Sequence, residues 1–295
     1  KHLTTSLNQV TGAVGFQKIN GEVRKLTIKA EKVIVACGSI HTPALLLRSG
    51  LRHPELGRNL YFHPTVGIAA RYSDLIEPWN GPMMSTVVSD AMRLDGNYGY
   101  WIETAPVHPG VIGMTLPWTS IEQHKKDLTM ASNCGAFIVL TRDKYGGKVS
   151  IDNHGNAVIN YKMHSYDLNH SIKGMQEASE IHFAAGAEEV IFPHRSRKTL
   201  LNTADEEQRT SFYKQMTSWK WRTNDYILYS AHQMSTCRMG GNSKTHPVRP
   251  DGSFVDYKNL FIADGSALPS CPGINPMMSI MAQSHFTIKN ILNGY

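Results

Sequence analysis

The chain has 295 residues, of which 41% are hydrophobic and 18% charged, and its formal net charge is +6. This apolar content supports a substantial core in one large or two moderate domains. No apolar run approaches the roughly 18 residues that span a bilayer, which excludes an obvious transmembrane helix. The Lys and Arg residues are dispersed along the chain, which argues against a nucleic-acid-binding surface. Contact with the surface of a membrane stays open.

The four cysteines stand at positions 37, 134, 237 and 271. They are too few and too scattered for a disulfide scaffold, and they lack the paired spacing of a zinc site. We therefore expect a reducing, intracellular compartment and no catalytic metal.

Near the N-terminus, residues 32–37 form a short apolar run that ends at Gly38. This pattern predicts a buried strand followed by a glycine turn. Thr42 and Pro43 are typical of a helix start, and Gly50 is typical of a helix end. We expect a strand, a turn and a helix with leucines at 45–47.

The middle of the chain has a different pattern. Alternating apolar residues predict strands at 66–72, 98–104, 134–140, 149–152 and 157–161, with hairpin turns at 144–148 and 153–156. Helices are expected at 120–132, 165–185 and 204–218. We predict an α/β (α+β) fold. In it, residues 66–222 form an inserted domain, an antiparallel sheet with helices on one side, while 1–65 and 223–295 form an α/β domain. The functional site is expected at the seam between them.

The run at residues 229–240, Tyr-Ser-Ala-His-Gln-Met-Ser-Thr-Cys-Arg-Met-Gly, contains a candidate proton acceptor, His232. Oxidation of an alcohol by hydride loss requires removal of the hydroxyl proton, and a histidine, with a pKa near ~6.5, suits that role. Asn275 carries an amide that can both donate and accept a hydrogen bond to the alcohol oxygen. A lone histidine is more often a structural hydrogen-bonding residue, so this assignment depends on the surrounding motif.

A helix is predicted to begin after Asn275, which is a good N-cap, with Pro276 at the first helical position. The side chains expected to face the core are Met277, Ile280, Met281 and Ile288. The N-terminus of such a helix carries roughly half a positive charge and can stabilise an anion. Asn275 could also be a helix cap alone.

Together these segments resemble the glucose-methanol-choline (GMC) family of flavoprotein oxidoreductases. Three segments are similar to the C-terminal catalytic region of this family: residues 229–240, Asp264-Gly265-Ser266 and residues 272–276. Their residues most resemble those of the long-chain fatty alcohol oxidases. Residues 38–51 are similar to the second GMC signature, except that Arg52 stands where the family usually has glycine.

The resemblance implies FAD as cofactor, with His232 as the catalytic base and Asn275 as the residue that helps to hold the substrate oxygen. The residues that it places at the cofactor are Ala36, Gly38, Asp264, Gly265, Asn275, Pro276 and Met277. Asp264 could instead simply end a strand. The implied reaction is oxidation of a primary, long-chain alcohol to an aldehyde, with hydride transfer to flavin and reoxidation by oxygen. Residues 1–65 and 223–295 are then parts of a Rossmann-like FAD-binding domain, and residues 66–222 are the inserted substrate-binding domain.

The sequence lacks the G-x-G-x-x-G turn that grips the dinucleotide in this family. We therefore expect the chain to be the C-terminal portion of a longer protein, with the N-terminal half as its partner. Three alternatives stay open: a GMC dehydrogenase with another electron acceptor, a flavin lyase or photoenzyme, and a non-catalytic structural subunit. A peroxisomal or membrane-associated location would rest on family analogy.

Overall fold

The computed structural model describes residues 1–82, 84–105 and 107–293. The chain divides into two compact units, each described separately below. Unit 1 comprises Lys1–Phe62, Lys144–Lys162 and Ala231–Tyr295, and unit 2 comprises His63–Asp143 and Met163–Ser230. Their division into cofactor-binding and substrate-binding functions, with boundaries at 65/66 and 222/223, stays a prediction.

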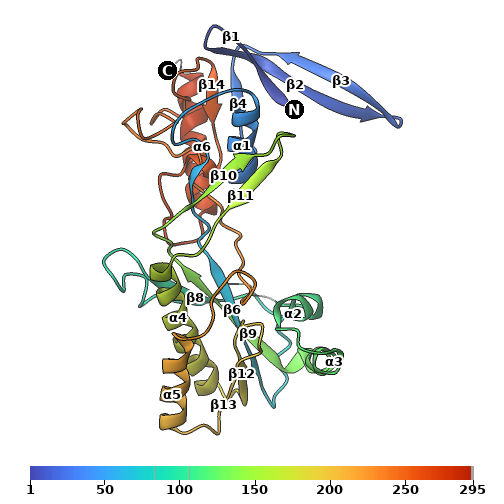
Figure 1. Cartoon of the computed structure of the whole chain (residues 1–295), viewed down its shortest axis with the longest axis vertical. Helices are drawn as coiled ribbons and strands as arrows, with labels where there is room; N and C mark the ends of the chain where they lie inside the picture. Colours follow the sequence, from blue (N-terminus) through green and yellow to red (C-terminus); the bar gives the residue numbers. More distant parts are fainter. Residues whose placement is uncertain (83, 106, 294–295) are drawn as a thin grey trace. The chain divides into compact units, whose positions relative to one another are not determined.

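Unit 1 begins with a three-stranded antiparallel meander of β1 (His2–Ser6), β2 (Gln9–Ile19) and β3 (Glu22–Lys29), drawn in blue in Figure 1. Asn20 and Gly21 connect the last two strands with φ values of 48° and 88°. Asn-Gly is the pair that tolerates positive φ at both positions of a tight hairpin turn. The local sequence thus accounts for this hairpin, which our sequence analysis did not predict.

The centre of unit 1 is a pair of parallel strands. β4 (Val33–Val35) pairs with β14 (Leu260–Ile262), so residues far apart in the sequence lie side by side. α1 (Gly38–Arg48) follows β4 directly, and the prediction that it starts at Thr42 is wrong. Gly38 has a φ of 78°, which allows the chain to turn from the strand straight into the helix.

A second small sheet in unit 1 corrects a prediction about the insert. β10 (Gly147–Ile151) pairs with β11 (Ala157–Asn160) and with β5 (Arg58–Leu60), and these strands form a sheet of their own. Val149 and Leu60 pack against Ala44 of α1. Because α1 buries the apolar face of this hairpin, the expected strands at 149–152 and 157–161 do not join the larger sheet.

Unit 2 contains a six-stranded antiparallel sheet. In spatial order its strands are β13 (Thr199–Leu201), β12 (Glu189–Ile191), β6 (Thr65–Arg71), β9 (Cys134–Thr141), β8 (Tyr100–Thr104) and β7 (Val87–Val88). The predicted strands at 66–72, 98–104 and 134–140 are therefore confirmed within a few residues. The short strands β7, β12 and β13 were not predicted.

Helices cover both faces of this sheet, which corrects the expectation of helices on one side (Figure 1). On one side lie α4 (Ser165–Ala184) and α5 (Glu206–Met216), and on the other α2 (Pro109–Thr115) and α3 (Ile121–Thr129). Side chains of a strand alternate between faces. Accordingly, Val139 of β9 joins the cluster under α4, whereas Cys134 joins the cluster under α2.

The last helix, α6 (Met277–Leu292), is the predicted one, but its buried face differs from the prediction. Met277 and Met281 are 67% and 59% exposed, and the buried residues are Thr287 and Ile291. A Cβ added at Gly252 would lie 2.3 Å from Thr287 Cγ2. This close approach fixes the rotation of α6 and turns the two methionines outward.

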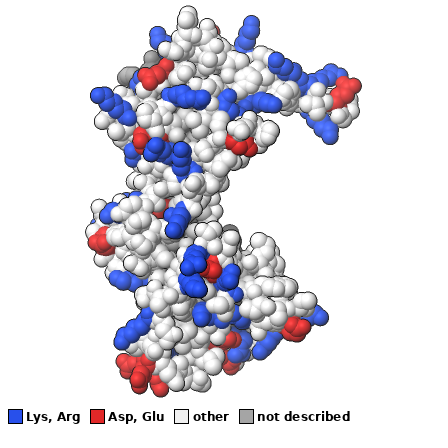
Figure 2. Space-filling model, in the orientation of Figure 1, with Lys and Arg blue, Asp and Glu red and all other residues white. Residues whose placement is uncertain are grey.

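None of the helices in the described ranges combines the length and the apolar composition needed to cross a bilayer. Figure 2 shows Lys and Arg side chains scattered over the visible face, with smaller groups of Asp and Glu among them. The charge is thus spread over the visible surface and does not form one basic field.

Candidate functional site

The segment that carries His232 has no regular secondary structure, but backbone hydrogen bonds fix the stretch that follows it. Met234 forms an antiparallel bridge with Tyr61. Beyond it, alternate N–H groups donate to consecutive carbonyls of the 265–267 turn: Ser235 to Gly265 (3.1 Å), Cys237 to Ser266 (2.8 Å) and Met239 to Ala267 (3.0 Å). His232 therefore precedes a stretch that is aligned along the Asp264-Gly265-Ser266 motif.

Asp264 joins that motif to the start of α1. Its Oδ2 accepts hydrogen bonds from the Gly38 N–H (2.9 Å) and the Thr42 hydroxyl (2.5 Å), and its Oδ1 accepts one from the Ser266 N–H (2.8 Å). The carboxylate is 7% exposed. Hydrogen bonds to a charged acceptor are about twice as strong as neutral ones. Asp264 thus holds both the turn at Gly38 and its own turn at Gly265 in place. Its side chain therefore has a positioning role.

A second link runs from α1 to the His232 segment. Pro43 lies inside α1 and has no N–H to donate to the carbonyl four residues earlier, that of Ser39. The Thr236 hydroxyl donates to this carbonyl instead, at 2.7 Å. In return, the Ser39 hydroxyl donates to the Gln233 carbonyl at 2.8 Å. The residue next to His232 is therefore held by α1.

Gly265 brings α6 to the same place. A Cβ built on it would lie 3.0 Å from Ile280 Cδ1 of α6 and 3.3 Å from the Gln233 carbonyl oxygen. Met234 and Ile280 also belong to one apolar cluster with Leu268 and Cys271. The His232 segment, the Asp264-Gly265 turn and the first turns of α6 thus meet around a position where only glycine fits easily.

His232 itself is half-buried. Burial lowers its pKa from the ordinary value of 6.5, because the protonated imidazolium is poorly solvated there. The neutral form, which can accept a proton, is therefore favoured at neutral pH. Burial raises the pKa of the nearby Cys237 thiol, and the charge of Asp264 raises it further, so this cysteine is a structural and not a nucleophilic residue.

The start of α6 differs from the prediction by one residue. The N-cap position is occupied by Pro276, with φ −87° and ψ 3°, and α6 begins at Met277. Asn275, expected at the N-cap, lies one residue outside the helix and is half-buried. Residues before proline are restricted to extended conformations, which explains why the helix does not start earlier. The amide of Asn275 is then not needed as a helix cap.

The predicted cofactor-contacting residues divide into two groups. Gly38 and Asp264 are joined directly, and Gly265 and Pro276 are buried. Ala36 and Met277 are exposed. Whether any of these residues contacts a cofactor stays a prediction.

Our sequence analysis did not single out Ser39, Thr42 and Thr236 as site residues, although all three are buried and make the hydrogen bonds that assemble the site. No signal in the sequence pointed to them, because Pro43 was expected at the start of the helix, where its missing N–H leaves no helical carbonyl without a partner.

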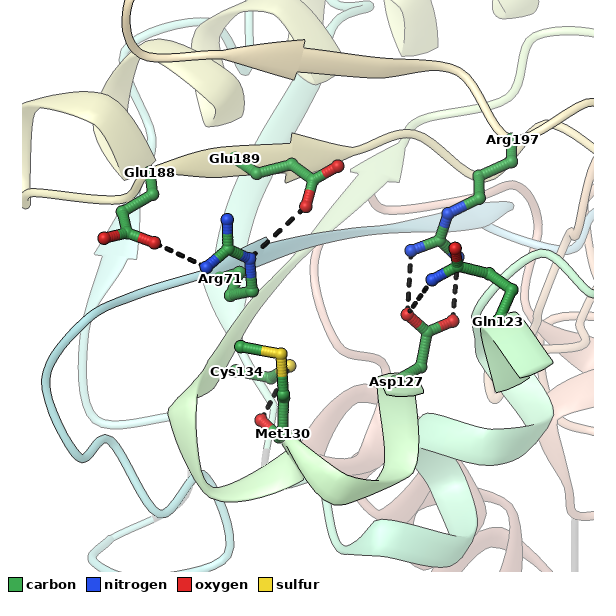
Figure 3. Close-up of polar contacts among 8 residues, drawn as sticks. All are labelled: Arg71, Gln123, Asp127, Met130, Cys134, Glu188, Glu189 and Arg197. Carbon is green, nitrogen blue, oxygen red and sulfur yellow. Dashed lines mark hydrogen bonds and ion pairs between the residues drawn. The ribbon is translucent and has the colours of Figure 1, made fainter. Parts of the chain in front are cut away.

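Unit 2 holds a separate cluster of charged side chains, shown in Figure 3. Arg197 and Asp127 form a bidentate ion pair with both distances at 2.8 Å, and Gln123 also donates to Asp127. Arg71 pairs with Glu188 and Glu189. Each arginine is paired with carboxylates here, as in a structural network that ties α3 to the sheet.

The same cluster surrounds a cavity of about 60 Å³ that contacts Cys134. The Cys134 thiol donates to the Met130 carbonyl, and burial raises its pKa to about 11. The thiol is therefore protonated at neutral pH and is unsuited to metal binding or nucleophilic attack. Within the described ranges, no group of three or more His, Cys, Asp or Glu residues is arranged to hold a metal ion.

Comparison with known protein families gives two matches, both to models of the GMC oxidoreductases. One covers residues 6–65 and the other residues 146–284. The first contains the β4–α1 turn, and the second contains His232, Asp264 and Asn275.

Individual relatives agree with this. Two long-chain-alcohol oxidases of Arabidopsis thaliana are 31% and 30% identical to this chain over 91% and 90% of its length. An uncharacterized GMC-type oxidoreductase of Sinorhizobium fredii is 30% identical over 90% of the chain. The chain spans 37%, 38% and 50% of the length of these three relatives.

Solved structures show the same fold. Pyridoxine 4-oxidase from Mesorbium loti matches 100% of this chain and 57% of its own, with a TM-score of 0.71 and 16% identity. Formate oxidase of Aspergillus oryzae matches 99% of this chain and 59% of its own, with a TM-score of 0.68 and 15% identity. The sequence resemblance is therefore confirmed, and the chain belongs to the GMC oxidoreductase family.

Proposed function

We propose that this chain carries the catalytic residues of an FAD-dependent oxidoreductase that oxidises a primary alcohol to an aldehyde. The observation that carries the proposal is the convergence on Gly265 of the His232 segment, the Asp264 turn and the first turns of α6. A base, an anion-stabilising helix end and a strand-to-helix turn are the parts that such a reaction needs.

The residues present fit a flavin. Ala36 and Cys37 are exposed at the end of β4, and no atom lies within 4 Å of a Cβ built on Gly38. The first N–H groups of α6 have no partner within the helix and carry its positive end. These features offer backbone donors and free space to a planar, anionic ring. When bound, FAD supplies the acceptor for the hydride that leaves the carbinol carbon.

The chain's own residues handle the proton and the oxygen. We propose that the neutral His232 imidazole accepts the hydroxyl proton, because burial keeps it unprotonated at neutral pH. The Asn275 amide holds the alcohol oxygen. Asp264 and Thr236 act on the reaction only by positioning, since their hydrogen bonds hold the turn and the segment next to His232.

The substrate proposal rests on the Arabidopsis relatives, whose names state long-chain-alcohol oxidase. We propose a long-chain primary alcohol as substrate and oxygen as the final acceptor. A second candidate is a dehydrogenase that passes electrons to another acceptor. It is favoured by 22% identity over 96% of the chain to the gluconate 2-dehydrogenase flavoprotein of Pantoea cypripedii. An intracellular location is likewise a proposal, favoured by the low cysteine content.

The decisive experiment is anaerobic mixing of the whole protein with primary alcohols of increasing chain length. Bleaching of the flavin absorbance, fastest with the longest chains, is the expected result. A flavin that stays oxidised with every alcohol would overturn the proposal. Oxygen consumption compared with reduction of an artificial acceptor then distinguishes the oxidase from the dehydrogenase.

Because the chain spans 37% of the length of its first relative, the contribution of residues 1–295 alone needs a separate measurement. Isothermal titration of the 295-residue chain with FAD is expected to show weak or no binding, since the sequence lacks the turn that grips the pyrophosphate. Tight, stoichiometric binding would show that these residues hold the cofactor without that turn.

A further inference from the structure

Unit 2 contains a cavity of about 330 Å³ at one end of its six-stranded sheet. It is lined by the 76–82 loop, the ends of β6, β8 and β9, and the C-terminal end of α4. Its volume lies within the range of sites that bind small molecules. None of the residues proposed for the flavin reaction lines this cavity, so it is independent of the proposed function.

Apolar and aromatic groups form most of the wall. Ile76, Pro78, Ala136 and Phe137 line the cavity, together with Tyr72. Gly135 makes room for the Tyr72 ring, because a Cβ there would lie 2.9 Å from Tyr72 Cε2. The wall therefore favours a compact apolar ligand.

A buried pair of polar side chains determines the hydrogen bonding in the cavity. The Tyr72 hydroxyl lies 2.7 Å from His182 Nδ1, and His182 Nε2 lies 3.3 Å from the Ile68 carbonyl oxygen. A carbonyl can only accept, so Nε2 carries the hydrogen and Nδ1 carries the lone pair. The Tyr72 hydroxyl must then donate to His182. Its oxygen is left as an acceptor for a ligand.

The charge of the lining excludes one ligand class. Among the described lining residues there is no Lys or Arg, and Glu77 carries the one formal charge. His182 is 1% exposed, and burial lowers its pKa to about 4, so it is neutral at neutral pH. An anion would meet no compensating positive charge in this cavity.

We propose that this cavity is a binding site for a small, uncharged aromatic or aliphatic molecule whose hydroxyl group donates to the Tyr72 oxygen. An alcohol with a compact apolar body fits the volume, the mainly apolar wall, the acceptor oxygen of Tyr72 and the lack of Lys and Arg among the described lining residues. An ether of similar shape lacks the donor, and a carboxylate carries the wrong charge.

The test is isothermal titration of the protein with benzyl alcohol, benzyl methyl ether and benzoate. Benzyl alcohol should bind about tenfold more tightly than the ether, the usual value of one neutral hydrogen bond. Benzoate should bind more weakly than both. In Tyr72→Phe the preference for the alcohol over the ether should disappear. Equal affinities for the three probes in the unmodified protein would overturn the proposal.

A second pair of variants keeps the test valid if Tyr72→Phe does not fold. Ala185 lines the cavity and is exposed, whereas Ala184 is also exposed but is not among the lining residues. Ala185→Leu should weaken benzyl alcohol binding by about tenfold or more, and Ala184→Leu should leave it unchanged. His232→Ala should also leave it unchanged. Loss of binding in His232→Ala with retention in Ala185→Leu would place the alcohol at the proposed oxidation site and overturn the inference.

Discussion

The two units of the chain bury their apolar side chains to different extents. In unit 2 the sheet is covered on both faces, and its largest cluster includes fully buried side chains such as Ile68, Val139 and Phe192. In unit 1, α6 carries three methionines that are 59–68% exposed, Met277, Met278 and Met281. Ile34 of β4 is 44% exposed. Both faces of the central sheet of unit 2 are thus covered, whereas in unit 1 a central strand and one face of α6 keep apolar side chains exposed.

The polar groups differ as well. Unit 1 holds its candidate site through hydrogen bonds between turns, with Asp264, Thr236 and Ser39 linking segments more than 190 residues apart. In unit 2, the polar groups include the Arg197–Asp127 ion pair and the histidine His182, which is buried inside an apolar core. We infer that single polar substitutions in unit 1 disturb the site, whereas unit 2 responds mainly to changes in burial and protonation.

The largest expected effect tests the role of unit 1. His232→Ala should slow flavin reduction by alcohol in the whole protein by at least ~10²-fold, the lower range for the loss of a general base. Flavin binding should change little. Anaerobic stopped-flow absorbance measures both quantities.

The matched control for this variant is His154→Ala, in the exposed turn between β10 and β11 of the same unit. It should reduce flavin at the parent rate. Parent-like reduction in His232→Ala would show that another group removes the proton.

In the parent, kcat/KM should fall only as the pH drops below about 6.5, since burial lowers the pKa of His232 and the active form is neutral.

Much of the site could be predicted from the sequence because its motifs are local. The helix after residue 276 and the turn at Gly38 each follow from a few adjacent residues. The face that α6 buries could not be predicted, because it depends on the contact between Gly252 and Thr287. The role of Thr236 likewise depends on Pro43, almost 200 positions away. Hydrophobic periodicity contains no information about which distant hydroxyl replaces a missing N–H.

A second prediction concerns unit 2 and its protonation. Burial lowers the pKa of His182 from 6.5 to about 4, so the unfolded chain binds a proton that the folded chain excludes. This depression corresponds to about 3 kcal/mol of stability, present above about pH 6.5 and lost as the pH falls to about 4. All five tryptophans of the chain lie in unit 2, so their fluorescence in urea titrations reports its unfolding.

His182→Gln is the matched variant, because an amide can accept from Tyr72 and donate to the Ile68 carbonyl without titrating. Its stability should fall less steeply between pH 6.5 and 4 than that of the parent. His170, whose pKa burial also lowers, is present in both proteins and cancels in the comparison. Identical slopes would show that His182 does not carry the acid sensitivity of unit 2.

A third prediction addresses the turns of unit 1. Asp264→Asn replaces one acceptor oxygen by an NH₂ group that faces N–H and O–H donors, and it should destabilise this unit by about 2 kcal/mol. The buried thiols of Cys237 and Cys271 provide the measurement, since they react with a disulfide reagent only when unit 1 opens. Asp256→Asn, at an exposed position with a φ of 66°, should leave their reaction rate unchanged. Tryptophan fluorescence should not respond to either variant.

The smallest expected effect concerns the contact of α6 and the His232 segment at Gly265. Gly265→Ala places a Cβ 3.0 Å from Ile280 Cδ1 and 3.3 Å from the Gln233 carbonyl, and it should cost about 1–2 kcal/mol. Gly241→Ala is the control, because no atom lies within 4 Å of its added Cβ. Ile280→Val removes the Cδ1 atom, so the double variant should be less destabilised than the sum of the two single ones. In the double variant, the protection of the thiols and the rate of flavin reduction should both return toward the parent values. They should do so together, because the same contact controls the packing of α6 and the placement of the residue next to His232. Additive effects would mean that α6 can move away from Gly265 without disturbing the site.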